Sequence, residues 1–251
     1  MEYLLAGLAT FIFTTILTIA GLGAAFILIP VFLALGIPLL TAMSIALLLN
    51  AVSMTLASIS YARHKLIVYK IAIPMIIAAS ILSPLGAITA AYLPKNVLLW
   101  LFAGFLVFAG SMMLFYKPKE KGAGEDIRQS LPIGLATGSA AGFIGGLLGV
   151  GGGNFIVPVL VWQGFDPKKA AATTALVVVF SSFAGFLGRI SFGSMDYSLL
   201  GVCAVGSILG ALLGAHLMKK TLSRGQVKTA IGLCLFLVAA KILMDLVAPS
   251  A

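Results

Sequence analysis

No aspartate, glutamate, lysine or arginine occurs between Leu4 and Ala62. A helix that spans a bilayer needs about 20 apolar residues, so this run is long enough for more than one membrane passage. Only 9% of the chain is charged and 61% is hydrophobic, whereas soluble domains carry about 25% charged residues. Such a chain cannot cover a water-facing surface. We therefore expect an integral membrane protein built from α-helices.

The remaining composition excludes several classes of function. The net charge of +9 does not indicate nucleic-acid binding, because the basic residues lie in short gaps between apolar runs. Met1–Tyr3 lacks the basic start of a signal peptide, so the first apolar segment is expected to stay in the mature protein. Cys203 and Cys234 fall inside apolar runs and are expected to serve packing. No metal-ligand cluster, nucleophile motif or phosphate loop is present in the sequence, and neither an enzyme, a metal nor a cofactor is expected.

An internal repeat divides the chain into two halves. The recurring residues are Gly21 and Gly149, Pro30 and Pro158, and Gly36 and Gly164. The separation is constant, since 149 − 21, 158 − 30 and 164 − 36 all equal 128. The only strongly polar stretch lies between the halves. We therefore predict a first membrane repeat at 1–116, a linker at 117–130 and a second membrane repeat at 131–251.

Each half contains four apolar segments. They lie at about 3–35, 39–62, 70–92 and 96–116, and at about 131–163, 167–188, 197–218 and 226–247. The first segment of each half, with about 33 residues, would form a helix near 50 Å long, which exceeds the ~30 Å hydrocarbon core. Glycines interrupt its middle. We expect each first segment to be a broken, re-entrant pair of helices followed by three transmembrane helices.

The distribution of basic residues predicts how the halves are oriented. If each broken pair returns to its starting side, each half crosses the membrane an odd number of times, and the two halves are inverted-topology repeats. Thirteen basic residues then lie inside and three outside, as the positive-inside rule requires. The inside set is Arg63, Lys65, Lys70, Lys117, Lys119, Lys121, Arg128, Lys168, Lys169, Lys219, Lys220, Arg224 and Lys228, and the outside set is Lys95, Arg189 and Lys241. This model places the linker in the cytoplasm and both termini outside.

Inverted repeats with broken helices place a substrate near the membrane midplane, where half-helix N-termini attract anions. In the second half, Gly151, Gly152, Gly153 and Asn154 would present backbone and side-chain amides just before a half-helix. These four residues are our first candidates for substrate binding. The alternative is that the glycines only allow close helix packing, and the sequence leaves both interpretations open.

The helices that follow the broken pairs supply further candidates. Thr174, Ser181 and Arg189 share one face of the helix predicted at 167–188, and Asn50 lies on the corresponding polar stripe of the first half. Arg189 is the candidate for compensating the charge of an anion. Hydroxyl groups in membrane helices also bond their own backbone or join neighbouring helices. Arg189, in turn, could extend to the membrane surface, so these alternatives remain open.

Several of these patterns resemble the TauE/SafE sulfite exporter family. They are the run from Gly149 to Gly153 with Pro158, the duplicated half, Tyr61-Ala62-Arg63 leading to Val68-Tyr69, and its partner Gly193–Tyr197. The resemblance covers nearly the whole chain. It implies a permease of a bacterial or archaeal inner membrane that moves sulfite, sulfonates or related organic acids, usually outward. The first half has Ala24 and Ala25 where the second has Gly152 and Gly153, which favours the second-half loop as the binding site.

The hypothesis is a secondary transporter, expected to export a small sulfur-containing oxyanion bound between the repeats. An anion channel and a non-transporting membrane scaffold are the alternatives, although the short loops offer little surface for a scaffold. The expected partners are the anion and membrane lipid, without nucleic acid. The sequence leaves open the substrate, the direction, the coupling ion and the oligomeric state, for which a homodimer is one option.

Overall fold

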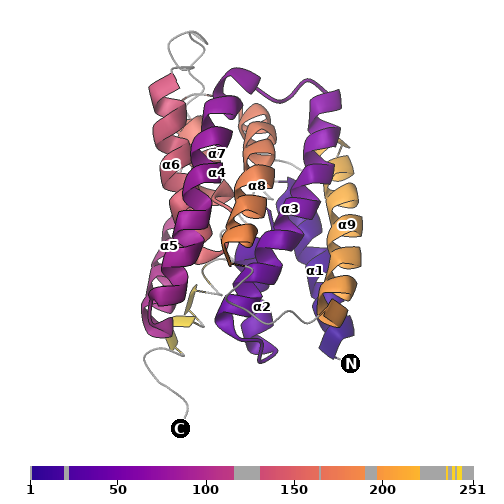
Figure 1. Cartoon of the computed structure of the whole chain (residues 1–251). Coiled ribbons are helices and arrows are strands. Elements are labelled where there is room, and N and C mark those ends of the chain that lie inside the picture. The colour runs from indigo at the N-terminus through magenta and orange to yellow at the C-terminus, as the bar shows by residue number, and fades with distance from the viewer. Residues whose placement is uncertain are drawn as a thin grey trace.

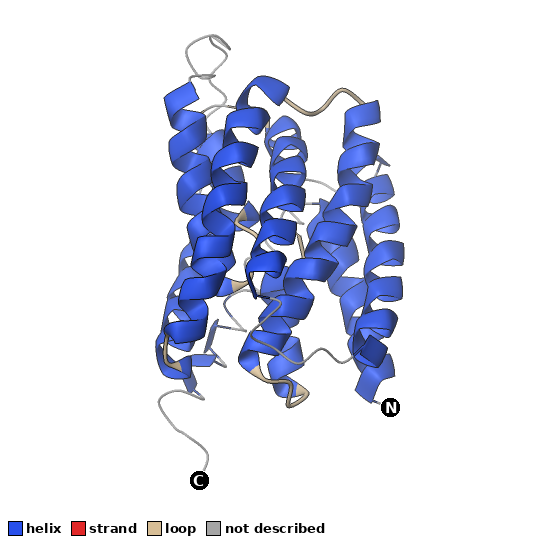
Figure 2. Cartoon of the chain, viewed as in Figure 1, coloured by secondary structure: helices blue, strands red, loops and turns tan. Residues whose placement is uncertain are grey.

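A computed structural model describes residues 2–19, 23–115, 131–163, 165–189 and 197–220, together with 236, 239–240 and 242–244. The predicted linker at 117–130 and most of the apolar segment at 226–247 lie outside these residues. Across the described ranges the regular structure is α-helix, without strands (Figure 2). The prediction of an all-α protein is therefore confirmed.

The helices match the predicted apolar segments to within a few residues. The first half contains α1 (Glu2–Ile19), α2 (Ala25–Ala34), α3 (Leu39–Arg63), α4 (Tyr69–Tyr92) and α5 (Lys95–Phe115). The second half contains α6 (Leu131–Leu148), α7 (Gly153–Trp162), α8 (Pro167–Arg189) and α9 (Tyr197–Lys220). They form one bundle, in which α8 lies between α3 and α4 (Figure 1).

The outer surface of the bundle is apolar. Among the described residues five helices are long and apolar enough to cross a membrane, namely α3, α4, α6, α8 and α9. On α4, Ile73, Ile77, Ile81 and Leu85 recur every fourth residue and are 50–61% exposed. A stripe of this kind is unfavourable in water and favourable against lipid tails. The chain is a multi-pass membrane protein.

Both predicted interruptions are present. The helix α6 ends at Leu148 and α7 begins at Gly153, while α1 ends at Ile19 and α2 begins at Ala25. Gly21 itself lies outside the described residues. The second arms α2 and α7 have 10 residues each. At 1.5 Å per residue these second arms are about 15 Å long, about half of the ~30 Å hydrocarbon core, so neither is long enough to cross it alone.

Glycines at helical spacing bring helices from opposite halves together. Gly134, Gly138, Gly142 and Gly146 form one stripe of α6, and α4 packs on that stripe. A Cβ on Gly138 would lie 2.6 Å from the carbonyl oxygen of Met75, and one on Gly142 would lie 2.5 Å from Cα of Ala79. The contacts advance together along both helices, so α4 and α6 run parallel. This is the small-residue packing that the sequence offered as one interpretation of its glycines.

The same packing recurs between α1 and α9. A Cβ on Gly206 would lie 2.5 Å from the carbonyl oxygen of Gly7, and one on Gly210 would lie 2.6 Å from that of Phe11. These two helices also run parallel. The first helix of each half therefore packs on a later helix of the other half, α1 on α9 and α6 on α4.

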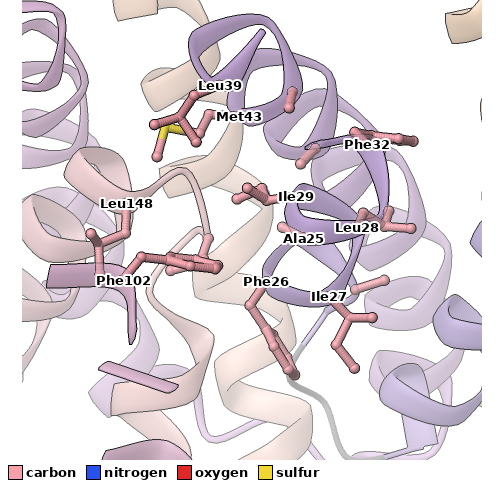
Figure 3. Packing of buried hydrophobic residues seen from close by; sticks show 14 of the residues in the cluster. Ala25, Phe26, Ile27, Leu28, Ile29, Phe32, Leu39, Met43, Phe102 and Leu148 are labelled. Carbon is pink, nitrogen blue, oxygen red and sulfur yellow. The ribbon is translucent and has the colours of Figure 1, made fainter. Parts of the chain in front are cut away.

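An apolar cluster joins the two interrupted pairs. Phe26 and Ile29 of α2, Met43 of α3 and Phe102 of α5 are buried in it together with Leu148, the last residue of α6 (Figure 3). The short arm of the first pair is thus packed in the same core as the end of the long arm of the second. The two interruptions therefore meet inside the bundle rather than at its ends.

Candidate functional site

A glycine-based cap ends α6. Gly149 has a φ of +72°, its N–H donates to the carbonyl of Gly146 at 3.3 Å, and the N–H of Val150 donates to the carbonyl of Gly145 at 2.8 Å. This pair of hydrogen bonds is the Schellman motif, which requires a left-handed residue directly after the helix. The sequence Gly149-Val150 therefore stops α6 inside the protein.

Glycine is required at the next two positions both by the backbone conformation and by the lack of space for a side chain. Gly151 and Gly152 have φ values of +74° and +76°. A Cβ on Gly151 would collide with Oγ of Ser182 and lie 2.7 Å from Nδ2 of Asn50, and one on Gly152 would collide with the carbonyl oxygen of Ala141. These glycines are unlike those of the α6 stripe, because they form the turn itself. Close helix packing is therefore confirmed for the α6 stripe, whereas substrate binding by the glycines of the turn stays a prediction.

The start of α7 carries polar groups without partners. Gly152 is its N-cap and supplies no side-chain acceptor, and the N–H groups of Gly153 and Asn154 have no acceptor within the described residues. The side chain of Asn154 is 2% exposed, and neither its Nδ2 nor its Oδ1 has a partner there. A helix N-terminus also bears a partial positive charge. This end of α7 lacks a hydrogen-bond acceptor, which an oxyanion would supply.

Asn50 of α3 lies between the two interruptions. Its Nδ2 donates to Oγ of Ser182 at 3.0 Å, beside Gly151. Its Oδ1 has no hydrogen-bond partner and lies where a Cβ on Gly23 would be. The carboxamide is 1% exposed. One buried side chain thus contacts the break of each half, and its role in substrate binding stays a prediction.

Ser181 fastens the second break to α8. Its hydroxyl donates to the carbonyl oxygen of Gly151 at 2.9 Å, and its own carbonyl accepts a hydrogen bond from Oγ of Ser83 at 2.6 Å. The N–H of Gly151 donates to the carbonyl of Gly145 at 3.2 Å. The donors of Gly151 and Ser181 are therefore both bonded to backbone carbonyls of the protein, and these bonds hold the turn in place. Sequence reasoning missed Ser83, because a serine in an apolar helix has no distinguishing pattern.

Thr174 and Arg189 lie away from this centre. They are seven and eight residues from Ser181 in opposite directions, so at 1.5 Å per residue they are about 22 Å apart along α8. Both are fully buried, and Oγ1 of Thr174 has no partner in the described part of the chain. One small anion cannot contact both. The structure groups Asn50, Gly151–Asn154 and Ser181, whereas Thr174 lies farther along α8 and the guanidinium of Arg189 contacts the end of α6 that precedes the turn.

Arg189 contacts the end of α6. Its Nη2 donates to the carbonyl oxygens of Gly146 at 2.7 Å and Leu147 at 3.2 Å, while Nε and Nη1 have no partner. The side chain is 0% exposed, so it does not extend to the membrane surface. Among the described residues no group of three His, Cys, Asp or Glu side chains could hold a metal ion.

The fold and this centre define a multi-pass membrane protein in which two interrupted helices meet at buried, partly unsatisfied polar groups. Comparison of the sequence with protein families gives a more specific result. The model of the family described as Sulfite exporter TauE/SafE matches residues 5–242. The chain belongs to this family, as the sequence motifs predicted.

Relatives in the family are named as transporters. The chain is 28% identical to "Probable membrane transporter protein YdhB" of Bacillus subtilis over 82% of this chain and 86% of the relative. It is 29% identical to "Probable membrane transporter protein ORF9" of Sinorhizobium sp over 83% and 80% of the two chains. It is 33% identical to "Sulfite exporter TauE/SafE family protein 5" of Arabidopsis thaliana, over 34% of this chain and 19% of that protein. No solved structure matches the chain.

Proposed function

We propose that this protein is a secondary transporter that exports a small sulfur-containing oxyanion, such as sulfite or an organosulfonate. The anion binds at the start of α7, between the two halves of the chain. The family name and the names of the relatives support the substrate class. The chemistry of the site supports an anion independently of these names.

The observation that carries the proposal is the set of unsatisfied donors at the break. The N–H groups of Gly153 and Asn154 and the amide of Asn154 are buried without an acceptor in the described structure. Each unsatisfied buried donor costs about 1–3 kcal/mol. An oxyanion has several acceptor oxygens on one atom and interacts favourably with the positive end of the α7 dipole. Binding would therefore recover most of this cost.

The proposal includes two inverted-topology repeats. Three features support it: the exchanged helix pairs α1 with α9 and α6 with α4, the parallel course of α6 and α4, and the equal lengths of the 10-residue second arms α2 and α7. Since α3 and α4 are joined by a short loop and run antiparallel, α6 runs opposite to α3. By contrast, α1 runs in the same direction as α3, because its last turn lies beside the last turn of α3, where Tyr61 contacts Thr18. The equivalent helices α1 and α6 therefore run in opposite directions.

The basic loops support an orientation in the membrane. The N–H of Val68 donates to Oγ1 of Thr173 at 3.0 Å, so the loop with Lys65 lies at the same end of the bundle as Lys168 and Lys169. A plain eight-helix arrangement would put these lysines on opposite sides. Their common location supports a cytoplasmic position for both loops, with both termini outside the inner membrane.

Burial of the site favours a carrier over a channel. Asn50, Asn154 and Ser181 are each at most 2% exposed, so the polar centre is closed on all sides in this conformation. An open pore would expose such groups to water. A carrier binds its substrate in a closed centre and opens alternately to the two sides.

The test is counterflow exchange of labelled sulfite by the full chain in proteoliposomes, with thiosulfate, taurine, sulfoacetate and small carboxylates as competitors. We expect saturable exchange with an oxyanion. The variant Asn154→Leu should raise the half-saturation concentration about tenfold, because the leucine cannot donate. The matched control is Asn96→Leu, which makes the same change at an exposed position of α5. Absence of saturable exchange with every anion, or equal effects of the two variants, would refute the proposal.

A further inference from the structure

The two halves hold the ends of their interrupted helices with different side chains at equivalent positions. In the first half, the hydroxyl of Tyr61 donates to the carbonyl oxygen of Thr18 at 2.7 Å. In the second half, Nη2 of Arg189 donates to the carbonyl oxygen of Gly146 at 2.7 Å. The repeat spacing relates both partners, since 146 − 18 and 189 − 61 both equal 128.

The locations within the helices agree as well. Thr18 and Gly146 belong to the last turns of α1 and α6, and Tyr61 and Arg189 belong to the last turns of α3 and α8. Both donor side chains are 0% exposed. The last four carbonyls of a helix lack partners within the helix, and a membrane interior provides no water to satisfy them. Each half therefore supplies one buried donor to the end of its long re-entrant arm.

The two donors differ in charge. A tyrosine hydroxyl is neutral, whereas an arginine stays protonated in proteins. Within the described residues no carboxylate pairs with Arg189, and its Nη2 contacts the carbonyls of both Gly146 and Leu147. The C-terminal end of a helix carries about half a negative charge. The partner of the buried guanidinium is therefore the negative end of α6.

This partner lies next to the proposed anion site. A Cβ on Gly145 would collide with the backbone nitrogen of Gly152, so the last turn of α6 touches the N-cap of α7. Without a cation there, the negative end of α6 would offset the positive end of α7 and repel an anion. With Arg189 in place, the field of the α7 N-terminus is left uncompensated.

We propose that Tyr61 and Arg189 are equivalent positioning residues that fix the ends of α1 and α6, and that the charge of Arg189 makes only the second break favourable for an anion. This inference rests on the proposed anion site for its second part. Arg189 acts through α6, because its Nη2 donates to the carbonyl oxygens of Gly146 and Leu147.

The first experiment measures sulfite binding to the purified full chain. Arg189→Met removes the charge and the donors, Arg189→Lys keeps the charge, and Arg189→Tyr installs the residue of the first half. We expect the dissociation constant to rise roughly tenfold in the Met and Tyr variants and to stay within about twofold in the Lys variant. The Tyr variant removes the charge but keeps a hydroxyl donor, so it tests the role of the charge even if the Met variant does not fold. Equal affinities of the Tyr variant and the wild type, or a Lys variant as weak as the Tyr variant, would overturn the role of the charge.

The second experiment needs no ligand and measures hydrogen exchange of the backbone amides at the two helix ends. Tyr61→Phe should accelerate exchange at the end of α1 and leave the sulfite dissociation constant within about twofold of the wild type. Arg189→Met should accelerate exchange at 145–151. Unchanged exchange in both variants would overturn the positioning role. If the wild type bound no oxyanion while exchange still increased as expected, the proposed function would fail and the positioning role would stand.

Discussion

Replacing Gly151 with alanine tests the geometry of the second break. The change adds one methyl group to a residue with a φ of +74°. A left-handed conformation costs a non-glycine residue about 1–2 kcal/mol. The new Cβ would also collide with Oγ of Ser182 and lie 2.7 Å from Nδ2 of Asn50. Overpacking in a closed interior costs a further ~1–3 kcal/mol.

Two other glycines separate these costs. Gly36 has a φ of +78° and Gly104 lies within α5, and a Cβ on either would meet nothing within 4 Å. Gly36→Ala therefore incurs the conformational cost alone. Gly104→Ala incurs neither cost and gains up to ~1 kcal/mol from the better helix propensity of alanine.

The assay is thermal unfolding of the purified protein in detergent. For a chain of this size each kcal/mol corresponds to roughly 2–4 °C in Tm. We expect Gly151→Ala to lower Tm by about 4–20 °C and Gly36→Ala by about 2–8 °C, with no loss for Gly104→Ala. A Gly151→Ala variant no less stable than Gly36→Ala would refute the crowding at the break.

Three further changes test neighbouring parts of the site. Thr174→Val should leave the sulfite dissociation constant within about twofold, because Thr174 lies ~10 Å along α8 from Ser181; a tenfold loss in a binding titration would place substrate near it. Ser83→Ala removes the hydrogen bond to the carbonyl of Ser181 and should lower stability by about 1 kcal/mol in thermal unfolding, and an unchanged Tm would contradict that bond. Gly142→Leu should prevent assembly of α6 on α4 and yield aggregated protein by size-exclusion chromatography, whereas Gly104→Leu should stay monodisperse.

The fold was predictable where one sequence feature fixed one structural outcome. The apolar segments at 3–35 and 131–163 are longer than one membrane passage and contain glycines near the middle, which favours broken helices, and the break at 149–152 is present as predicted. The placement of Asn50 and Gly151 near one another was also within reach, because the repeat related the two breaks. These inferences needed only spacing and the length of a membrane span.

The hydrogen-bond partners of individual donor groups were not predictable from the sequence. The sequence marks Ser181 and Arg189 as polar groups in an apolar setting, but it does not say that Ser181 donates to the carbonyl of Gly151 or that Arg189 donates to the carbonyl of Gly146. Those partners depend on how α8 crosses α6, which is decided by the packing of the whole helix bundle. A common stripe on one helix face also does not imply a common pocket, since the stripe from Thr174 to Arg189 is several times longer than a small anion.

The position of Asn50 connects the asymmetry of the breaks to transport. A carrier must move one half against the other, and Asn50 is the side chain that contacts Gly23 in the first break and Ser182 beside the second. The first break presents Ala24 at its N-cap in an ordinary helical conformation, whereas the second presents Gly152 in a left-handed one. The N–H groups of Ala25 and Phe26, like those of Gly153 and Asn154, have no acceptor within the described residues, so the two breaks differ in the conformation of the N-cap and in the buried carboxamide of Asn154. If the anion binds at the second break as proposed, movement of one half against the other would change the contacts of Asn50 with the first break, and this carboxamide would couple the two breaks.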